Sequence, residues 1–209
     1  DRKAPDKFRN ESEFQQIRAW QKAGIRLDEL EARQLKLIHD AFVPNQIEES
    51  VLRDIVERET QLETTFNTFR SDFEGGKASD NELREILRTE SHPVRRRAAW
   101  ESTKQVGQAV ASDLLELIAI RNREARKLGY SDYYSMMFEL QELDEKWVFS
   151  LLDRLEQLSE RAFTEIKAEL DATMKRKYGI TEPESYPWLY SDPFFQEFPA
   201  AGAAESLDD

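Results

Sequence analysis

Apolar residues recur at three- and four-residue steps along most of the chain, which is the period of one face of an α-helix. Between residues 11 and 42 they form one stripe: Phe14, Ile17, Trp20, Leu27, Leu30, Leu35, Ile38 and Phe42. Gly24 is a weak point in this stripe because glycine disfavours a helix interior, and Pro44 closes it. The pattern predicts a helical element over 11–42.

A second stretch predicts a long helix, a turn and a short helix. Its apolar positions, Val51, Ile55, Leu62, Phe66, Phe69 and Phe73, predict a helix over 47–73. Gly75 and Gly76 would stop this helix because glycine tolerates positive φ. Ser79 and Glu82 have the spacing of a capping box, which predicts a short helix reaching about residue 89.

The third stretch predicts a helix of about thirty-five residues, because Ser91 and Pro93 mark a helix start and Gly129 is a C-terminal cap candidate. Small residues along it would let a neighbouring helix approach closely. The sequence directly before it, Ser91-His92, would then belong to the helix start rather than to a metal site.

Two more helices are predicted after Gly129. Ser131 can cap a short helix over 133–138, and Asp144 can cap a helix over 145–178 that Gly179 ends. The second would be roughly 50 Å long, whereas a compact ball of this chain length is roughly 43 Å across. The sequence therefore predicts an all-α protein, built as an elongated layer of long antiparallel helices.

The segment after Gly179 has a different composition. Helical periodicity stops, four of the seven prolines occur, and aromatic residues cluster: Tyr186, Trp188, Tyr190, Phe194, Phe195 and Phe198. Disordered segments are poor in aromatic residues, so this segment needs a surface to lie on. It folds back over the helices, or it begins a second half of the protein. We expect a helical lobe over 1–179, and over 180–209 an irregular segment with an acidic tail.

Composition narrows the function. The 30 Lys and Arg against 42 Asp and Glu give a net charge of −12, which disfavours binding to nucleic acid or to anionic membranes. Cysteine is absent, so thiolate metal sites and cysteine nucleophiles are excluded, and only His39 and His92 offer imidazole. No apolar run is long enough to span a bilayer, and no signal peptide is visible. We expect a cytoplasmic protein.

Common catalytic motifs are missing. The sequence has no G-x-S-x-G, no G-x-x-x-x-G-K-[ST] and no G-x-G-x-x-G motif, and Gly75-Gly76-Lys77 is better explained as a turn. His39 and His92 lack zinc-ligand spacing, so His39 is expected to be a surface or capping residue. Arg95, Arg96 and Arg97 run against the helix dipole, so we expect them to pair with acidic neighbours.

Three stretches resemble a known family. The first comprises Phe69-Arg70 and the run Asn81-Glu82-Leu83-Arg84-Glu85-Ile86-Leu87-Arg88. The second begins at residues 97–107 (RAAWESTKQVG) and continues to residues 121–130 (RNREARKLGY). The third covers residues 188–197 (WLYSDPFFQE). Together they resemble the N-terminal half of the bacterial relatives of peptidyl-dipeptidase A, the angiotensin-converting-enzyme-like zinc metallopeptidases related to thimet oligopeptidase and oligoendopeptidase F.

The resemblance implies one wall of a two-lobed helical enzyme that cleaves peptides with one zinc ion. In that family a His-Glu-x-x-His helix and a further glutamate hold the metal, and none of these residues matches a position of this chain. The resemblance therefore implies no catalytic or metal-binding residue here, no zinc in this chain and no activity of this chain alone. Zinc, a catalytic C-terminal half and the peptide substrate would belong to the full-length enzyme.

The aromatic segment supplies the only expected site residues. If it approaches the catalytic half, its members are candidates for contact with substrate in the cleft: Trp188, Tyr190, Asp192, Phe194, Phe195 and Gln196. The alternative is a non-catalytic helical scaffold that binds a protein partner along an apolar groove.

Overall fold

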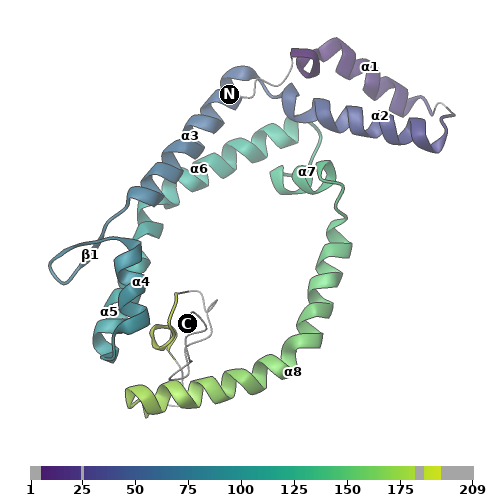
Figure 1. Ribbon diagram of the computed structural model, residues 1–209. Helices are drawn as coiled ribbons and strands as arrows, with labels where there is room; N and C mark the ends of the chain where they lie inside the picture. Colours follow the sequence, from purple (N-terminus) through teal and green to yellow (C-terminus); the bar gives the residue numbers. More distant parts are fainter. Residues whose placement is uncertain (1–5, 25, 182–185, 194–209) are drawn as a thin grey trace, which may run out of the picture. The chain divides into compact units, whose positions relative to one another are not determined.

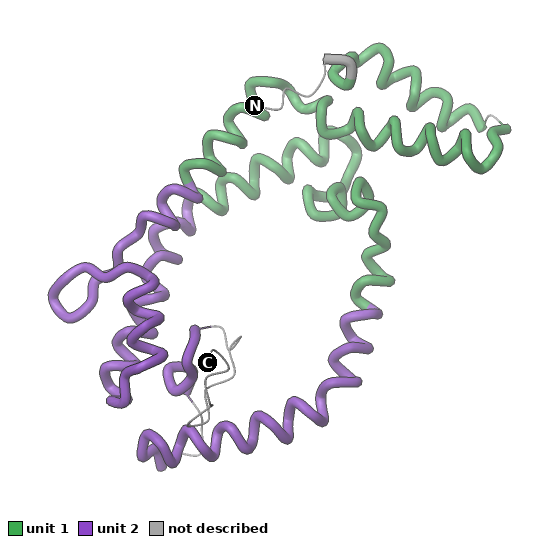
Figure 2. The backbone as a smooth tube through the Cα atoms, in the orientation of Figure 1, with its two compact units in different colours: residues 1–61, 113–149 green, residues 62–112, 150–209 purple. Residues whose placement is uncertain are grey.

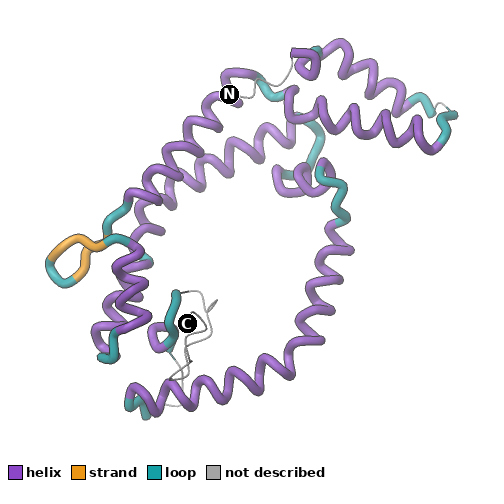
Figure 3. The backbone as a smooth tube through the Cα atoms, viewed as in Figure 1, coloured by secondary structure: helices purple, strands orange, loops and turns teal. Residues whose placement is uncertain are grey.

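The computed structural model describes residues 6–24, 26–181 and 186–193, and these residues are predominantly helical (Figures 1 and 3). The all-α prediction is confirmed. The α-helices are α1 (Glu11–Lys22), α2 (Glu29–Phe42), α3 (Glu49–Thr68), α4 (Asp80–Thr89), α5 (Pro93–Thr103), α6 (Gln105–Lys127), α7 (Tyr133–Leu140) and α8 (Glu145–Tyr178). Short 3-10 turns, η1 (Asp6–Arg9), η2 (Val43–Gln46) and η3 (Pro187–Leu189), and a hairpin of β1 (Ser71–Phe73) and β2 (Gly76–Ala78) complete the described elements.

The chain divides into two compact units (Figure 2), and each is described by itself. Unit 1 comprises residues 1–61 and 113–149, and unit 2 comprises residues 62–112 and 150–209. The expected lobe boundary at residue 179 and the expected layer of antiparallel helices stay predictions.

The core of unit 1 joins α1 and α2 to the end of α6 and to α7. Its buried members are Phe14, Ile17, Phe42, Val43, Ala125 and Met136. Gly24 has a φ of 60°, and Asp28 opens α2 with a capping box to Glu31, so the predicted element over 11–42 consists of two helices.

Unit 2 has two clusters. In one, Leu83 and Leu87 of α4 pack with Ala99 of α5 and Ala78 of β2. In the other, Leu170 and Met174 of α8 pack with Leu189 and Tyr190 of the segment that follows α8, together with the partly buried Tyr178, Ile180, Tyr186 and Trp188.

Local capping signals located several helix ends correctly. The capping box of Ser79 and Glu82 opens α4, and the Asp144 carboxylate accepts from the Trp147 amide at the start of α8. Gly129 and Gly179 follow α6 and α8 with φ values of 101° and 64°. Asp132, one residue after the predicted Ser131, caps α7.

The prediction of one helix over 47–73 was wrong at its end. α3 stops at Thr68, where Arg70 donates to the carbonyls of Thr68 and Phe69, and residues 71–78 form the antiparallel hairpin. Contacts with α5 hold this hairpin, since the Ser71 hydroxyl donates to the Ser102 carbonyl at 2.8 Å and Ser102 donates to the Asp72 carbonyl at 2.9 Å.

The prediction of one helix from residue 93 to about 128 was also wrong, because a turn at Lys104 separates α5 from α6. The Thr103 hydroxyl donates to the Trp100 carbonyl, and the Ser102 carbonyl accepts from Ser71. These side-chain bonds compete for helix carbonyls near the turn.

Candidate functional site

The described part of the aromatic segment, residues 186–193, lies against α5 and α8 within unit 2, and Arg96 of α5 anchors it. Arg96 Nε donates to the Trp188 carbonyl at 2.9 Å, and Nη2 donates to the Tyr190 carbonyl at 2.9 Å. Nη1 donates to the carbonyl of Glu90 at 2.8 Å. One guanidinium therefore ties the loop before α5 to the segment after α8, through main-chain oxygens alone.

Arg96 is only 1% exposed, which is rare for an arginine. Its three carbonyl partners satisfy the planar fork of donors, and the guanidinium carbon lies 4.6 Å from the centroid of the Tyr178 ring. Burial lowers the pKa of Arg96, while Tyr178 and Glu90 oppose that shift. The flanking arginines behave as expected, since Arg95 pairs with Glu74 and Glu90 and Arg97 pairs with Glu101.

Tyr190 provides a second anchor, on α8. Its hydroxyl donates to Asp171, and Lys167 Nζ lies 2.7 Å from the same hydroxyl and from both Asp171 oxygens. Burial raises the pKa of Tyr190, and its hydrogen bond to Asp171 raises it further. Tyr190 is 6% exposed and packs with Leu170, Met174 and Leu189.

Trp188 completes the contact with α5 by stacking. Its ring lies parallel to Tyr186 with centroids 4.6 Å apart, and its centroid is 5.8 Å from that of Trp100. The Arg97 guanidinium lies 5.0 Å from the Trp188 centroid. The sequence left two possibilities for this segment: it folds back over the helices, or it begins a second half of the protein. Residues 186–193 fold back over the helices.

Of the six predicted cleft residues, the structure places Trp188 and Tyr190 in one cluster of unit 2, and both Tyr190 and Asp192 are buried. Phe194, Phe195 and Gln196 lie outside the described residues. Contact of these residues with substrate stays a prediction.

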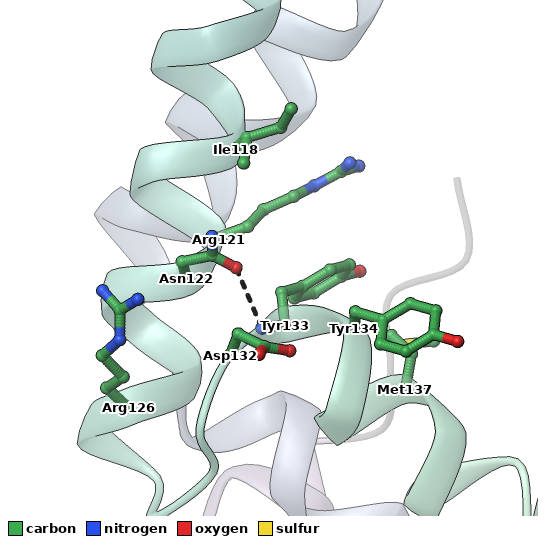
Figure 4. A pocket seen from close by; sticks show the side chains of 8 residues that line it. All are labelled: Ile118, Arg121, Asn122, Arg126, Asp132, Tyr133, Tyr134 and Met137. Atoms are coloured by element: carbon green, nitrogen blue, oxygen red, sulfur yellow. Dashed lines mark hydrogen bonds between the residues drawn. The ribbon is translucent and has the colours of Figure 1, made fainter. Parts of the chain in front are cut away.

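Unit 1 contains a recess between α6 and α7 that sequence reasoning did not single out (Figure 4). Its volume is about 470 Å³, and it is lined by Ile118, Arg121, Asn122, Arg126, Asp132, Tyr133, Tyr134 and Met137. Gly129 follows the end of α6 and Asp132 is the N-cap of α7, so a short connection joins the two helices. Asn122 fixes the start of α7, because its Oδ1 accepts from the Tyr133 amide at 3.0 Å.

Arg121 is the main cation of this recess. It forms an ion pair with Glu59 of α3, and its guanidinium carbon lies 5.0 Å from the Tyr133 centroid. Its Nε is buried and has no hydrogen-bond partner in the described part of the chain. The feature of the sequence that could have drawn attention to this recess is the run from Arg121 to Tyr130, which is part of the family resemblance.

The residues that the structure describes do not fit a zinc site. Within the described ranges no group of three or more His, Asp or Glu residues is arranged to hold a metal ion. His39 and His92 belong to different units. His39 is not the surface or capping residue expected: its side chain is 15% exposed, stacks on Phe14 at 5.5 Å and lies 3.1 Å from Asp40 Oδ1. His92 is the N-cap of α5, as expected.

Comparison with known proteins identifies the family. The family model described as angiotensin-converting enzyme matches residues 4–182, and the chain belongs to this family of peptidases. Neither the curated proteins nor the solved structures gave a match. No helix among the described residues combines the length and the apolar character needed to cross a membrane.

Proposed function

We propose that this chain is the N-terminal, cleft-forming part of a zinc-dependent metallopeptidase of the peptidyl-dipeptidase or oligopeptidase type, which hydrolyses peptide bonds in peptides. The match to the angiotensin-converting enzyme family over residues 4–182 carries the proposal. The resemblance of three stretches to bacterial members of that family supports it.

The zinc ligands belong, in this proposal, to a catalytic C-terminal half beyond Asp209. The printed residues contain two histidines and no His-Glu-x-x-His motif, and a catalytic zinc site of this kind needs two histidines one helical turn apart. The chain alone is then inactive and contributes a wall of the substrate cleft.

A direct test is to compare this chain with the longer polypeptide encoded by the same reading frame. The longer protein should bind one zinc per chain by elemental analysis and should cleave short peptides, and a chelator should abolish the cleavage. The 209-residue chain should do neither. A reading frame that stops after Asp209, or chelator-sensitive cleavage by the 209 residues alone, would contradict the proposal.

The alternative is a non-catalytic scaffold that binds a protein partner, and one observation favours it. α8 carries many exposed large apolar side chains: Trp147, Phe149, Leu151, Leu152, Leu155, Leu158 and Ile166. So much exposed apolar surface is typical of an interaction site, and in the proposed enzyme the rest of the same polypeptide would cover it. Absence of peptidase activity in the longer protein would favour the scaffold over the peptidase.

A further inference from the structure

Unit 2 contains a small recess beside the turn between α5 and α6. Its volume is about 220 Å³, and an apolar cavity of about 150 Å³ is enough to hold a benzene molecule. The lining residues come from α3, α4, α5, the turn, α6 and the segment after α8: Phe66, Asp80, Arg84, Thr103, Lys104, Val106, Gly107 and Pro193. The recess therefore has room for one aromatic ring.

The polar groups around this recess already have partners within unit 2. Arg84 Nε donates to Asp80 at 2.6 Å. The Thr103 hydroxyl donates to the Trp100 carbonyl at 2.7 Å, and the Lys104 ammonium lies 4.8 Å from the centroid of the Trp100 ring. A polar ligand would have to displace these contacts, whereas an apolar group would leave them in place. The recess thus favours an apolar occupant.

Apolar walls and open space above α6 shape this recess. Phe66 is 59% exposed although its side chain is large and apolar, and Val106 and Pro193 are half-buried. A Cβ atom added at Gly107 would meet nothing within 4 Å, so the space above this position of α6 is open. An aromatic ring seated here would remove apolar surface of the three walls from water, which is favourable.

The chain itself supplies aromatic rings at this point. The described residues end at Pro193, a wall of the recess, and the next two residues in the sequence are Phe194 and Phe195. Consecutive Cα atoms are about 3.8 Å apart, so the bond to Pro193 keeps Phe194 within reach of the recess. Its ring avoids the entropic cost that a separate molecule has when it associates.

We propose that this recess receives the phenyl ring of Phe194. Arg96 and the Tyr190 hydroxyl attach the segment to α5 and α8, and Phe194 is then a third attachment, to α3 and α6. This contact does not depend on the proposed peptidase function. It removes Phe194 from the residues predicted to contact substrate and leaves Phe195 and Gln196 among them.

NMR of the 209-residue chain tests the contact directly, with the Val106 methyl groups as reporters. In the wild type a nuclear Overhauser effect should connect the Phe194 ring protons to these methyl groups, and the ring current should shift the methyl signals. Phe194→Ala should abolish the Overhauser effect and remove the shift. Phe195→Ala is the matched control, because it deletes the neighbouring ring, and it should leave both unchanged.

Benzene tests whether the recess is already filled. It should bind Phe194→Ala in a saturable manner, followed at Val106, and should bind the wild type at least about tenfold more weakly, because the recess is rarely vacant there. Gly107→Leu places a side chain in the recess, so it should abolish benzene binding in the Phe194→Ala background. Gly107→Ala adds only one methyl group and is the control for that variant.

Four results would overturn the inference. The wild type shows no Overhauser effect between Phe194 and Val106, or Phe195→Ala removes the shift of the methyl signals instead. Benzene binds the wild type as tightly as Phe194→Ala, which would make the recess a site for an external apolar ligand. The methyl shift depends on protein concentration, which would assign the occupant to a second copy of the chain. If Phe194→Ala does not fold, the Overhauser effect in the wild type still decides.

Discussion

Arg33 of α2 forms a two-point ion pair with Glu142, and Glu142 has left-handed backbone with a φ of 59°. Glu142 follows α7 at the position where glycine is usually preferred, since the next amide, of Leu143, bonds back to the Phe138 carbonyl. Lys36 lies 3.5 Å from the same carboxylate. Two cations of α2 thus hold a strained residue directly before α8.

Substitutions at Glu142 should separate the backbone strain from the ion pair. Glu142→Ala keeps the strain and loses a half-exposed ion pair, so it should lower the free energy of unfolding by up to about 1 kcal/mol. Glu142→Gly also loses the pair but relieves the strain, so it should be about 1 kcal/mol more stable than the alanine variant. Urea unfolding measures both, and an alanine variant as stable as the glycine variant would contradict the account.

The Arg96 anchor should be a large contributor to the stability of unit 2. Arg96→Ala leaves the carbonyls of Glu90, Trp188 and Tyr190 without their donor, and should cost about 2 to 4 kcal/mol. Arg96→Lys should recover only part of this, because one ammonium cannot reproduce the planar fork.

Arg88→Ala is the control for this anchor, since Arg88 is an exposed arginine of α4 in the same unit. It should change the free energy of unfolding by less than about 1 kcal/mol. Hydrogen exchange provides a second readout: the amides of residues 186–193 should exchange faster in Arg96→Ala and at the wild-type rate in Arg88→Ala. Unchanged exchange in both would show that Arg96 does not anchor the segment.

Glu90 should titrate far below an ordinary glutamate. The hydrogen bond from Arg95, then that from the His92 amide, lower the pKa of Glu90 from 4.5 to about 2. A carboxylate with a lowered folded-state pKa contributes stability above pH 4.5, and this contribution is lost as the pH falls toward 2. Carboxyl NMR should give a midpoint near 2, and Arg95→Gln should raise it toward 4.5.

Glu90→Gln is the complementary variant, because glutamine does not titrate. The stability of this variant should fall less steeply than that of the wild type over the same acid range. Parallel acid curves for the two proteins would rule out a contribution of Glu90 to acid unfolding.

Tyr130 should make the fold sensitive to alkali. Burial raises the pKa of Tyr130 from 10 to about 12, with Glu139 and Asp40 adding to the shift. The unfolded chain loses this proton first, so stability that is complete below pH 10 should decline as the pH rises toward 12. Tyr130→Phe should decline less over that window, as measured by circular dichroism. Identical curves for the wild type and Tyr130→Phe would show that other groups cause the loss of stability in alkali.

The sequence located helices where the signal was local. α8 covers the predicted 145–178, because Asp144 caps its start and Gly179 follows its end. The hairpin and the break at Lys104 depend instead on bonds between Ser71, Asp72 and Ser102, which are distant in the chain and cannot be read from periodicity.

At the candidate sites, too, local signals could be predicted and contacts distant in the chain could not. Aromatic composition identified residues 186–193 as a segment that needs a surface, and this segment packs on α8. The run of three arginines predicted acidic pairing, which holds for Arg95 and Arg97 but not for the buried Arg96. No local pattern distinguishes Arg96 from its neighbours, because its partners are main-chain oxygens of Glu90 and of residues 188 and 190, which any sequence provides.

That choice of partners has an evolutionary consequence. Since Arg96 binds the carbonyl of residue 188 and not its side chain, this contact does not restrict which amino acid occupies the position. Relatives could exchange Trp188 and alter whatever its ring contacts while the main chain stays attached at the same point. Selection on the arginine and selection on the Trp188 ring are thereby separated, whereas Tyr190 is held by its own side chain, through its hydroxyl bonds with Lys167 and Asp171.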